Sequence, residues 1–135
     1  MRSFTKVTTL LDNKSPGFLH KPDYPLAIAT SGKSVRVTLG GEVIAETSDA
    51  LVMTESDYGP VYYIPRADVL VGLMEKTYHS SHCPFKGDAS YWTINAGDQT
   101  AENAVWSYEM PFDEVAIIRE TMSFYTSKVD AIEVS

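Results

Sequence analysis

The sequence predicts a mainly β protein, with two antiparallel sheets packed at a steep angle in a β-tent-like arrangement and two short helices. Short segments in which apolar and polar residues alternate, bounded by turn residues, favour antiparallel strands. The chain also lacks the glycine-rich strand-to-helix turns of parallel dinucleotide-binding sheets. Its 135 residues are typical of one core, so we expect a single domain over 1–135.

The first thirty residues differ in composition from the rest of the chain. Pro16, Gly17, Pro22 and Pro25 fall in this stretch. Because proline restricts φ and lacks a backbone donor, we expect 1–30 to be an extended segment that wraps the core.

Two β-hairpins follow. Residues 34–47, "SVRVTLGGEVIAET", alternate on either side of a Gly-Gly pair, which permits the positive φ of a tight turn. Residues 50–56 and 60–65 predict a second hairpin that turns at "DYGP". Both hairpins pair strands that are neighbours in the sequence.

The two helices are expected over 65–77 and 112–120. In the first, apolar residues repeat at helical spacing after Pro65, which suits a first helical turn. In the second, Asp113 is the expected N-cap.

Three strand segments complete the predicted fold. Residues 89–94 and 103–110 are expected to pair around "NAGDQ", and 122–134 to end the chain as a strand with a turn near Ser127.

Charge and composition exclude several classes of partner. The net charge is −7, with 11 Lys and Arg against 18 Asp and Glu, so we expect no nucleic-acid partner and no anionic membrane. No apolar run suggests a signal peptide or a membrane helix. Cys83 is the single cysteine, which excludes an internal disulfide and is consistent with a reducing compartment. These features predict a cytoplasmic protein; they do not predict its oligomeric state.

The stretch 79–92, "HSSHCPFKGDASYW", contains the residues with most chemical potential. His79, His82 and Cys83 are three metal-ligand types, but structural zinc needs four ligands, usually in two short pairs. In a strand, His82 and Cys83 also point to opposite faces. We therefore expect no metal and no cofactor.

A thiol nucleophile and a phosphate site are two further readings of this stretch. Cys83 needs an adjacent cation or imidazole to form a thiolate, and a lone cysteine is more often a small buried residue. "KGDA" lacks the GxxxxGK[ST] spacing and the following helix of a phosphate-binding loop. A turn in which Gly87 has positive φ and Asp88 binds local amides is the simpler interpretation.

A fourth reading is an aromatic pocket. Tyr91, Trp92, Trp106 and Tyr108 alternate along two neighbouring predicted strands. Small-ligand sites are mostly apolar and aromatic with a few convergent polar groups. The alternative is that both tryptophans are core residues, which is common in small domains.

Five segments taken together resemble a known family. These are "VRVTLGGEVIAET", "YYIPRADV", "HCPFKGDASYW", "AVWSYEMP" and "SFYTSKVD", in that order. Their pattern is similar to that of the domain of unknown function 427 family, over about 26–129. The block around Cys83 is the most specific of the five. The family pattern has threonine directly before this block, where the present chain has Ser81.

This resemblance implies a β-tent-like fold of two antiparallel sheets. Its relatives by fold include methionine sulfoxide reductase B and the ligand-binding domain of cereblon, in which paired CxxC motifs bind zinc. The present chain has no CxxC, so neither zinc nor the reductase activity carries over. The family is sometimes called nucleotidyltransferase-like. Such enzymes use two metal-binding carboxylates, usually in a DxD motif, and this sequence has none.

We therefore expect a small-molecule-binding β domain with an aromatic and basic pocket for a small, anionic ligand. Whether it catalyses a reaction is left open. Arg66 is expected to clamp the anion with help from Lys86, unless Arg66 pairs with Glu55 or Asp68 instead. The alternative function is a non-catalytic interaction or structural module. The expected ligand-binding residues are Glu55, Tyr63, Arg66, His82, Cys83, Lys86, Tyr91 and Trp106.

Overall fold

The computed structural model describes residues 12–135, and within that range the predicted fold class is confirmed. The fold is mainly β, with two antiparallel sheets and no closed barrel among the described residues. In spatial order the seven strands of the larger sheet are β1 (Leu26–Thr30), β4 (Leu51–Glu55), β5 (Tyr58–Pro65), β9 (Thr121–Phe124), β8 (Gln99–Ser107), β7 (Gly87–Ala96) and β6 (Met74–Cys83). Those of the smaller sheet are β10 (Ala131–Val134), β2 (Val35–Leu39) and β3 (Glu42–Thr47).

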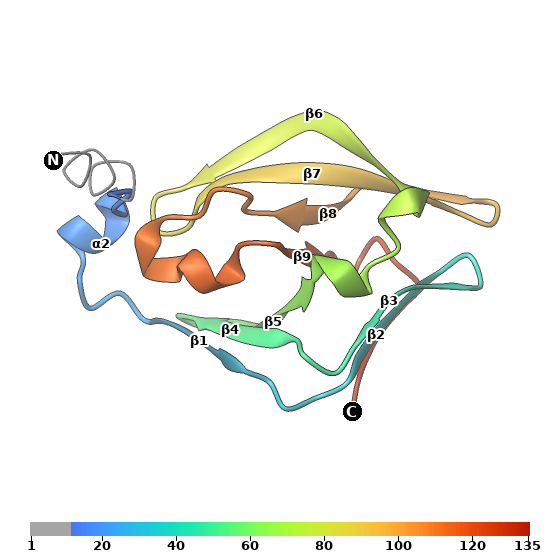
Figure 1. The fold of residues 1–135 in the computed structure, drawn as a ribbon, viewed down its shortest axis with the longest axis horizontal. Coiled ribbons are helices and arrows are strands. Elements are labelled where there is room, and N and C mark those ends of the chain that lie inside the picture. The colour runs from blue at the N-terminus through green and yellow to red at the C-terminus, as the bar shows by residue number, and fades with distance from the viewer. Residues whose placement is uncertain (1–11) are drawn as a thin grey trace, which may run out of the picture.

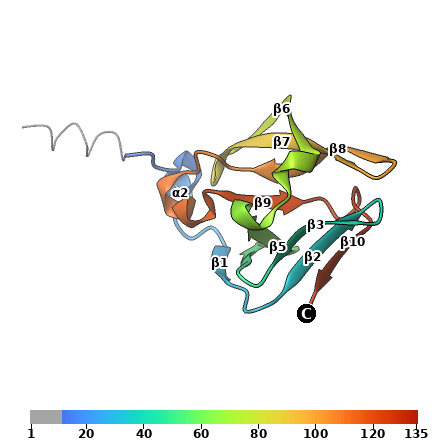
Figure 2. The same ribbon diagram turned by 45° about the vertical axis from the view of Figure 1, so that its right-hand side comes forward.

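The larger sheet bends so that its two ends lie on opposite sides of the molecule (Figure 1). Strands β6, β7 and β8 form the upper layer, and β1, β4 and β5 form the lower layer. Strand β9 joins them, because it pairs with β5 on one side and β8 on the other. The smaller sheet packs at one end, its strands oblique to β7 and β8 (Figures 1 and 2).

Both predicted hairpins form. Strands β2 and β3 pair around Gly40 and Gly41, whose φ values are 59° and 80°. Positive φ at both turn positions is the geometry that Gly-Gly predicts. Strands β4 and β5 form the second hairpin, but it turns earlier than predicted, at Ser56 and Asp57, so that Tyr58 to Pro60 already belong to β5.

The N-terminal segment packs on the domain, but the prediction that it is extended throughout is wrong for part of it. Pro16–His20 form the short helix α2, where the Ser15 side chain accepts a hydrogen bond from the Phe18 amide. Ser15 followed by Pro16 is typical of the start of a helix. The prediction of an extended segment relied on the number of prolines and did not use this signal. Residues 26–30 are extended, as β1. Residues 1–11 of the predicted segment lie outside the described residues.

The predicted helix over 65–77 is wrong. Two single 3-10 turns, η1 (Arg66–Asp68) and η2 (Val71–Leu73), replace it, and β6 begins at Met74. The apolar residues at helical spacing do not share a buried face: Leu70 is exposed, whereas Val69 is buried. The Leu70 amide donates to the Ile44 carbonyl of β3. At this point the segment is therefore hydrogen-bonded to the smaller sheet and does not form a continuous helix.

The second predicted helix is the 3-10 segment η3 (Asp113–Ile118). Phe112 stands at its N-cap with no side-chain cap, so the prediction that Asp113 caps it is wrong. The Asp113 carboxylate instead accepts a hydrogen bond from the Asn13 amide at 2.9 Å. Segment η3 lies between the two layers of the larger sheet (Figure 1).

Two hydrophobic cores result from strand alternation. The first core lies between the two sheets and includes Ile64, Trp92 and Phe124. The second core lies on the other face of the larger sheet and is covered by η3; it includes Tyr63 and Tyr91. Adjacent residues therefore belong to different cores, as the two-residue period of a strand requires. Among residues 12–135, no helix is long and apolar enough to cross a membrane.

Candidate functional site

Four of the residues expected from the sequence gather around one cavity of about 360 Å³, here called the Lys86 cavity. They are Glu55, Tyr63, Lys86 and Trp106. Met53, Tyr58, Gly59 and Val61 complete its wall. Strands β4 and β5 supply one side, β8 supplies Trp106, and the turn between β6 and β7 supplies Lys86. The bend of the larger sheet brings these elements together.

Local backbone structure places Lys86 toward the cavity. The chain turns at Pro84–Lys86, and Gly87 then starts β7 with a φ of 119°. The predicted positive φ at Gly87 is thus confirmed. Among residues 12–135, no amide donates to the Asp88 carboxylate, so that part of the prediction is wrong; Asp88 Oδ1 lies 2.7 Å from His82 Nδ1 instead.

A nearly buried ion pair is the main polar feature of the cavity. Lys86 Nζ lies 2.8 Å from Glu55 Oε1, and the two side chains are only 13% and 18% exposed. The Tyr24 hydroxyl donates to Glu55 Oε2 at 2.6 Å. Among the described residues, Glu55 is the single side-chain acceptor of the Lys86 ammonium, which has three N–H donors. Two donors therefore remain for water or a ligand.

The pair holds both groups in their charged forms. Burial raises the pKa of the Glu55 carboxyl, but hydrogen bonds from Lys86 and Tyr24 outweigh burial and lower that pKa overall. For Lys86, burial lowers the pKa, but the hydrogen bond to Glu55 together with the charges of nearby groups, Glu55 included, outweighs burial, so that the pKa of the ammonium is raised. The hydrogen bond to Glu55 raises the pKa of Tyr24 to about 12, which keeps this hydroxyl a donor.

Aromatic rings surround the ion pair. Tyr63 and Trp106 meet edge to face, with ring centroids 6.4 Å apart. Lys86 Nζ lies 5.7 Å from the centroid of the Tyr108 ring, within cation–π range. Burial raises the pKa of Tyr63, despite the opposing charge of Lys86 and a hydrogen bond from the Trp106 side chain. The exposed Tyr58 stands at the rim of the cavity.

Cys83 is half-buried and packs against the second core, whereas His82 is exposed. His82 Nδ1 lies 2.7 Å from Asp88 Oδ1, and His82 lines a different cavity, with Met110 and Phe112. The two neighbours thus point to opposite faces of β6. The described residues contain no group of three His, Cys, Asp or Glu side chains that could hold a metal ion.

Arg66 is also separate from the Lys86 cavity, so the expectation that Arg66 and Lys86 hold one anion together is wrong. Arg66 lies 5.5 Å from the centroid of the Trp92 ring and pairs with Glu109 at 3.7 Å, rather than with Glu55 or Asp68. The last residue of β5, Pro65, pairs with Thr121 of β9. Arg66 therefore lies just beyond the end of this strand pair.

Tyr91 lies in the second core, next to Trp106 across the β7–β8 pair. Its hydroxyl lies 2.8 Å from Ser81 Oγ and 3.5 Å from the Tyr125 hydroxyl. Tyr91 does not line the Lys86 cavity. These two contacts provide hydrogen-bond partners for the hydroxyl of the buried Tyr91 side chain.

The residues that sequence reasoning missed are Tyr24, Met53, Tyr58, Gly59 and Val61. Tyr24 lies in the proline-rich segment, for which the sequence predicts only a role in wrapping the core. It stacks on Phe85 with ring centroids 3.7 Å apart, beside the turn that carries Lys86. Tyr24 and Phe85 lie far apart in the chain, so no local sequence pattern predicts their contact.

Comparison with known proteins identifies the family of the chain but gives no curated relative. A comparison with curated proteins gives no match. Residues 27–135 match the family described as "Domain of unknown function (DUF427)". This match covers every strand from β2 onward and nearly all of β1, including all residues of the Lys86 cavity. Tyr24 and α2 lie before it. The chain belongs to the domain of unknown function 427 family, as the resemblance in its sequence predicted.

Proposed function

We propose that this domain binds a small uncharged molecule with a carbonyl-type acceptor and an apolar body, and that the Lys86 cavity is its site. One observation carries the proposal: a nearly buried ammonium, inside an aromatic cavity, has one acceptor among the described residues. Buried polar groups are normally fully hydrogen-bonded. A ligand oxygen is well suited to the remaining donors of Lys86.

The charge of the cavity supports an uncharged ligand. Glu55 cancels the charge of Lys86 at 2.8 Å, so a phosphate or carboxylate meets a neutral pair rather than a free cation. An anion also approaches the Glu55 carboxylate, which opposes its binding. A neutral acceptor such as an amide or ketone therefore replaces, in this proposal, the anionic ligand expected from the sequence.

The walls support an apolar body. Trp106 and Tyr63 offer ring surfaces, and Met53 and Val61 offer aliphatic ones. Pockets of this type obtain affinity from apolar contact and selectivity from a few polar groups. A volume of about 360 Å³ is within the range of small-ligand sites.

Three probes that share one ring and differ in charge test the proposal. We expect benzamide to bind more tightly than benzoate or benzylamine in calorimetric titrations. Glu55→Gln keeps one acceptor oxygen for Lys86, lets its amide N–H donate to the Tyr24 hydroxyl and removes the negative charge, so it should shift the preference toward benzoate.

The double variant Glu55→Gln/Lys86→Met removes both charges and leaves neither one buried alone. Hydrogen bonds to charged groups contribute about 1.5–3 kcal/mol, so benzamide affinity should fall at least tenfold. Unchanged benzamide affinity in this variant would sink the proposal. If wild-type protein binds none of the three probes, the alternative of a non-catalytic interaction module is favoured.

A further inference from the structure

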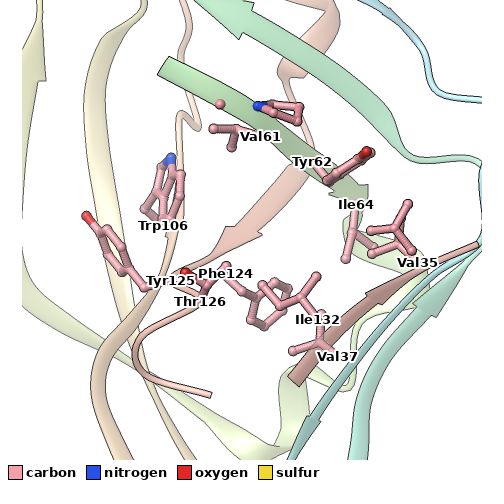
Figure 3. Close-up of a pocket in the computed structure, with 13 residues that line it drawn as sticks. Val35, Val37, Val61, Tyr62, Ile64, Trp106, Phe124, Tyr125, Thr126 and Ile132 are labelled. Atoms are coloured by element: carbon pink, nitrogen blue, oxygen red, sulfur yellow. The ribbon is translucent and has the colours of Figure 1, made fainter. Parts of the chain in front are cut away.

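A second cavity of about 350 Å³, drawn in Figure 3, shares lining residues with the Lys86 cavity. It lies between the smaller sheet and strands β5 and β9 of the larger sheet. Figure 3 shows Trp106 and Tyr125 on one side, facing Val35 and Ile64 across the space. We call it the apolar cavity.

The lining of the apolar cavity differs from that of the Lys86 cavity. It contains no charged side chain among the described residues. Its lining includes six hydrocarbon side chains: Val35, Val37, Ile64, Phe124, Ile132 and Val134. A mostly apolar lining without a charge favours a hydrocarbon group over a charged one.

The two cavities share part of their wall. Gly59, Val61 and Trp106 line both. Trp106 contacts Tyr63 on the side of the Lys86 cavity and the Tyr125 ring, 4.5 Å away between centroids, on the side of the apolar cavity. The Trp106 ring thus lies at the boundary of the two spaces.

Gly59 leaves this boundary open. It has no side chain, and a Cβ placed there meets no atom within 4 Å. No side chain at this position obstructs a flexible chain that passes Trp106. Trp106 then provides a ring surface for a molecule that occupies both cavities.

We propose that the ligand is an elongated amphiphile: an uncharged carbonyl head on Lys86 and an aliphatic tail that passes Gly59 into the apolar cavity. This inference rests on the proposed function of the Lys86 cavity and adds the class of its ligand. The head satisfies the donors of Lys86, and the tail covers the apolar walls that the smaller sheet contributes.

A series of primary alkyl amides tests the inference. We expect affinity to rise from propanamide through hexanamide to decanamide. Burial of one methylene contributes about 0.8 kcal/mol, which corresponds to roughly a fourfold gain in affinity per added group while the tail enters the cavity. Isothermal calorimetry below the aggregation limit of each amide measures this slope.

Val134→Asp places a charge at the mouth of the apolar cavity and should flatten the slope without weakening propanamide. Its matched control is Val43→Asp, because Val43 and Val134 are 40% and 39% exposed and lie on strands of the same sheet. Val43 does not line either cavity. The control should keep the wild-type slope.

Gly59→Val is a second, independent variant. Gly59 lies in a strand with open space around its Cβ position, so valine fits there without strain. Its side chain narrows the passage, so the loss in affinity relative to wild type should be at least tenfold greater for decanamide than for propanamide. Gly72→Val, at another position with open space, is the control.

The outcomes separate the two proposals. If propanamide binds through Lys86 but added methylenes bring no affinity, or Val134→Asp leaves the slope unchanged, the amphiphile inference is wrong and the Lys86 site stands. If decanamide binds equally well to Glu55→Gln/Lys86→Met, the head-and-tail arrangement is overturned. If no amide binds, both proposals fail.

Discussion

At the scale of single residues, the pair of Glu55 and Lys86 links stability to pH. The pKa of Glu55 is lowered in the folded protein, so its contribution is complete above the unfolded value of about 4.3 and is lost as pH falls through the folded value. The pKa of Lys86 is raised, so its contribution is complete below about 10.4 and is lost as pH rises through the folded value. Both contributions are present between these limits.

We predict that the free energy of unfolding of the wild type, minus that of Glu55→Gln/Lys86→Met, is largest at intermediate pH and declines below about pH 4 and above about pH 10. Urea titrations over a pH series measure this difference. The exposed pair of Arg36 and Glu46 provides a control, Arg36→Met/Glu46→Gln, whose effect should be small throughout. A difference for the first pair that does not vary with pH contradicts the prediction.

At the scale of elements, α2 holds the turn that carries Lys86. The Gly17 amide and the Ser15 hydroxyl both donate to the Pro84 carbonyl, at 2.9 and 2.7 Å. Gly17 packs so closely that a Cβ there lies 2.7 Å from a Phe85 ring carbon and 2.8 Å from the Pro84 carbonyl oxygen. The N-terminal segment therefore supports the Lys86 cavity from behind, although it lies before the residues matched to the family.

We predict that Gly17→Ala destabilises the protein by about 1–3 kcal/mol, because the added methyl group has no room. It should also weaken benzamide binding, since α2 must move away from the turn that positions Lys86. Thermal unfolding and calorimetry measure the two effects. Gly72→Ala, where a Cβ meets no atom within 4 Å, is the control and should leave both unchanged. Equal effects of the two substitutions are incompatible with this role of α2.

At the scale of the whole molecule, β9 connects the two halves of the larger sheet. All four of its residues are buried. Ser123 Oγ donates to the Tyr62 carbonyl on β5, and Ser107 Oγ on β8 donates to the Thr121 carbonyl. Because β9 contacts both halves, the two hydrophobic cores should unfold in one cooperative transition.

The two tryptophans report on different cores, since Trp92 belongs to the first and Trp106 packs against the second. We predict that Trp92→Phe and Trp106→Phe each unfold with the same midpoint by fluorescence and by circular dichroism. Separate midpoints within one variant indicate that the cores unfold independently.

Met122→Ala tests the role of β9 directly. Met122 is 0% exposed, so we expect a loss of about 2–5 kcal/mol in the free energy of unfolding. Met110→Ala, at a side chain that is 68% exposed, is the control and should have little effect. Urea denaturation followed by circular dichroism measures both.

The sequence predicted those parts of the fold that depend on local pattern. The Gly40–Gly41 hairpin, the strands around "NAGDQ" and the positive φ of Gly87 follow from alternation and turn chemistry. Strand β6 was missed because most of its residues are polar and exposed, so it has no apolar alternation. The residues that precede it imitate helical spacing. Backbone pairing with β7, a contact across the sequence, makes this segment a strand.

The candidate site was only partly predictable for the same reason. The residue types were identified from the sequence, including Glu55, Lys86 and Trp106. Which of them converge depends on the bend of the larger sheet and on the direction in which each side chain leaves its strand. Those two features bring Lys86 to Glu55, send Arg66 to Glu109 and turn His82 toward Asp88.

The sequence by itself therefore determined the mainly β class, the order of the local hairpins and the family. The tertiary structure decided the ion pair of Lys86, the role of Tyr24 and the second cavity beside Trp106. The physical reason is the range of the interactions. Alternation and turn preferences act over a few residues, whereas the path of a bent sheet depends on contacts between segments that lie far apart in the chain.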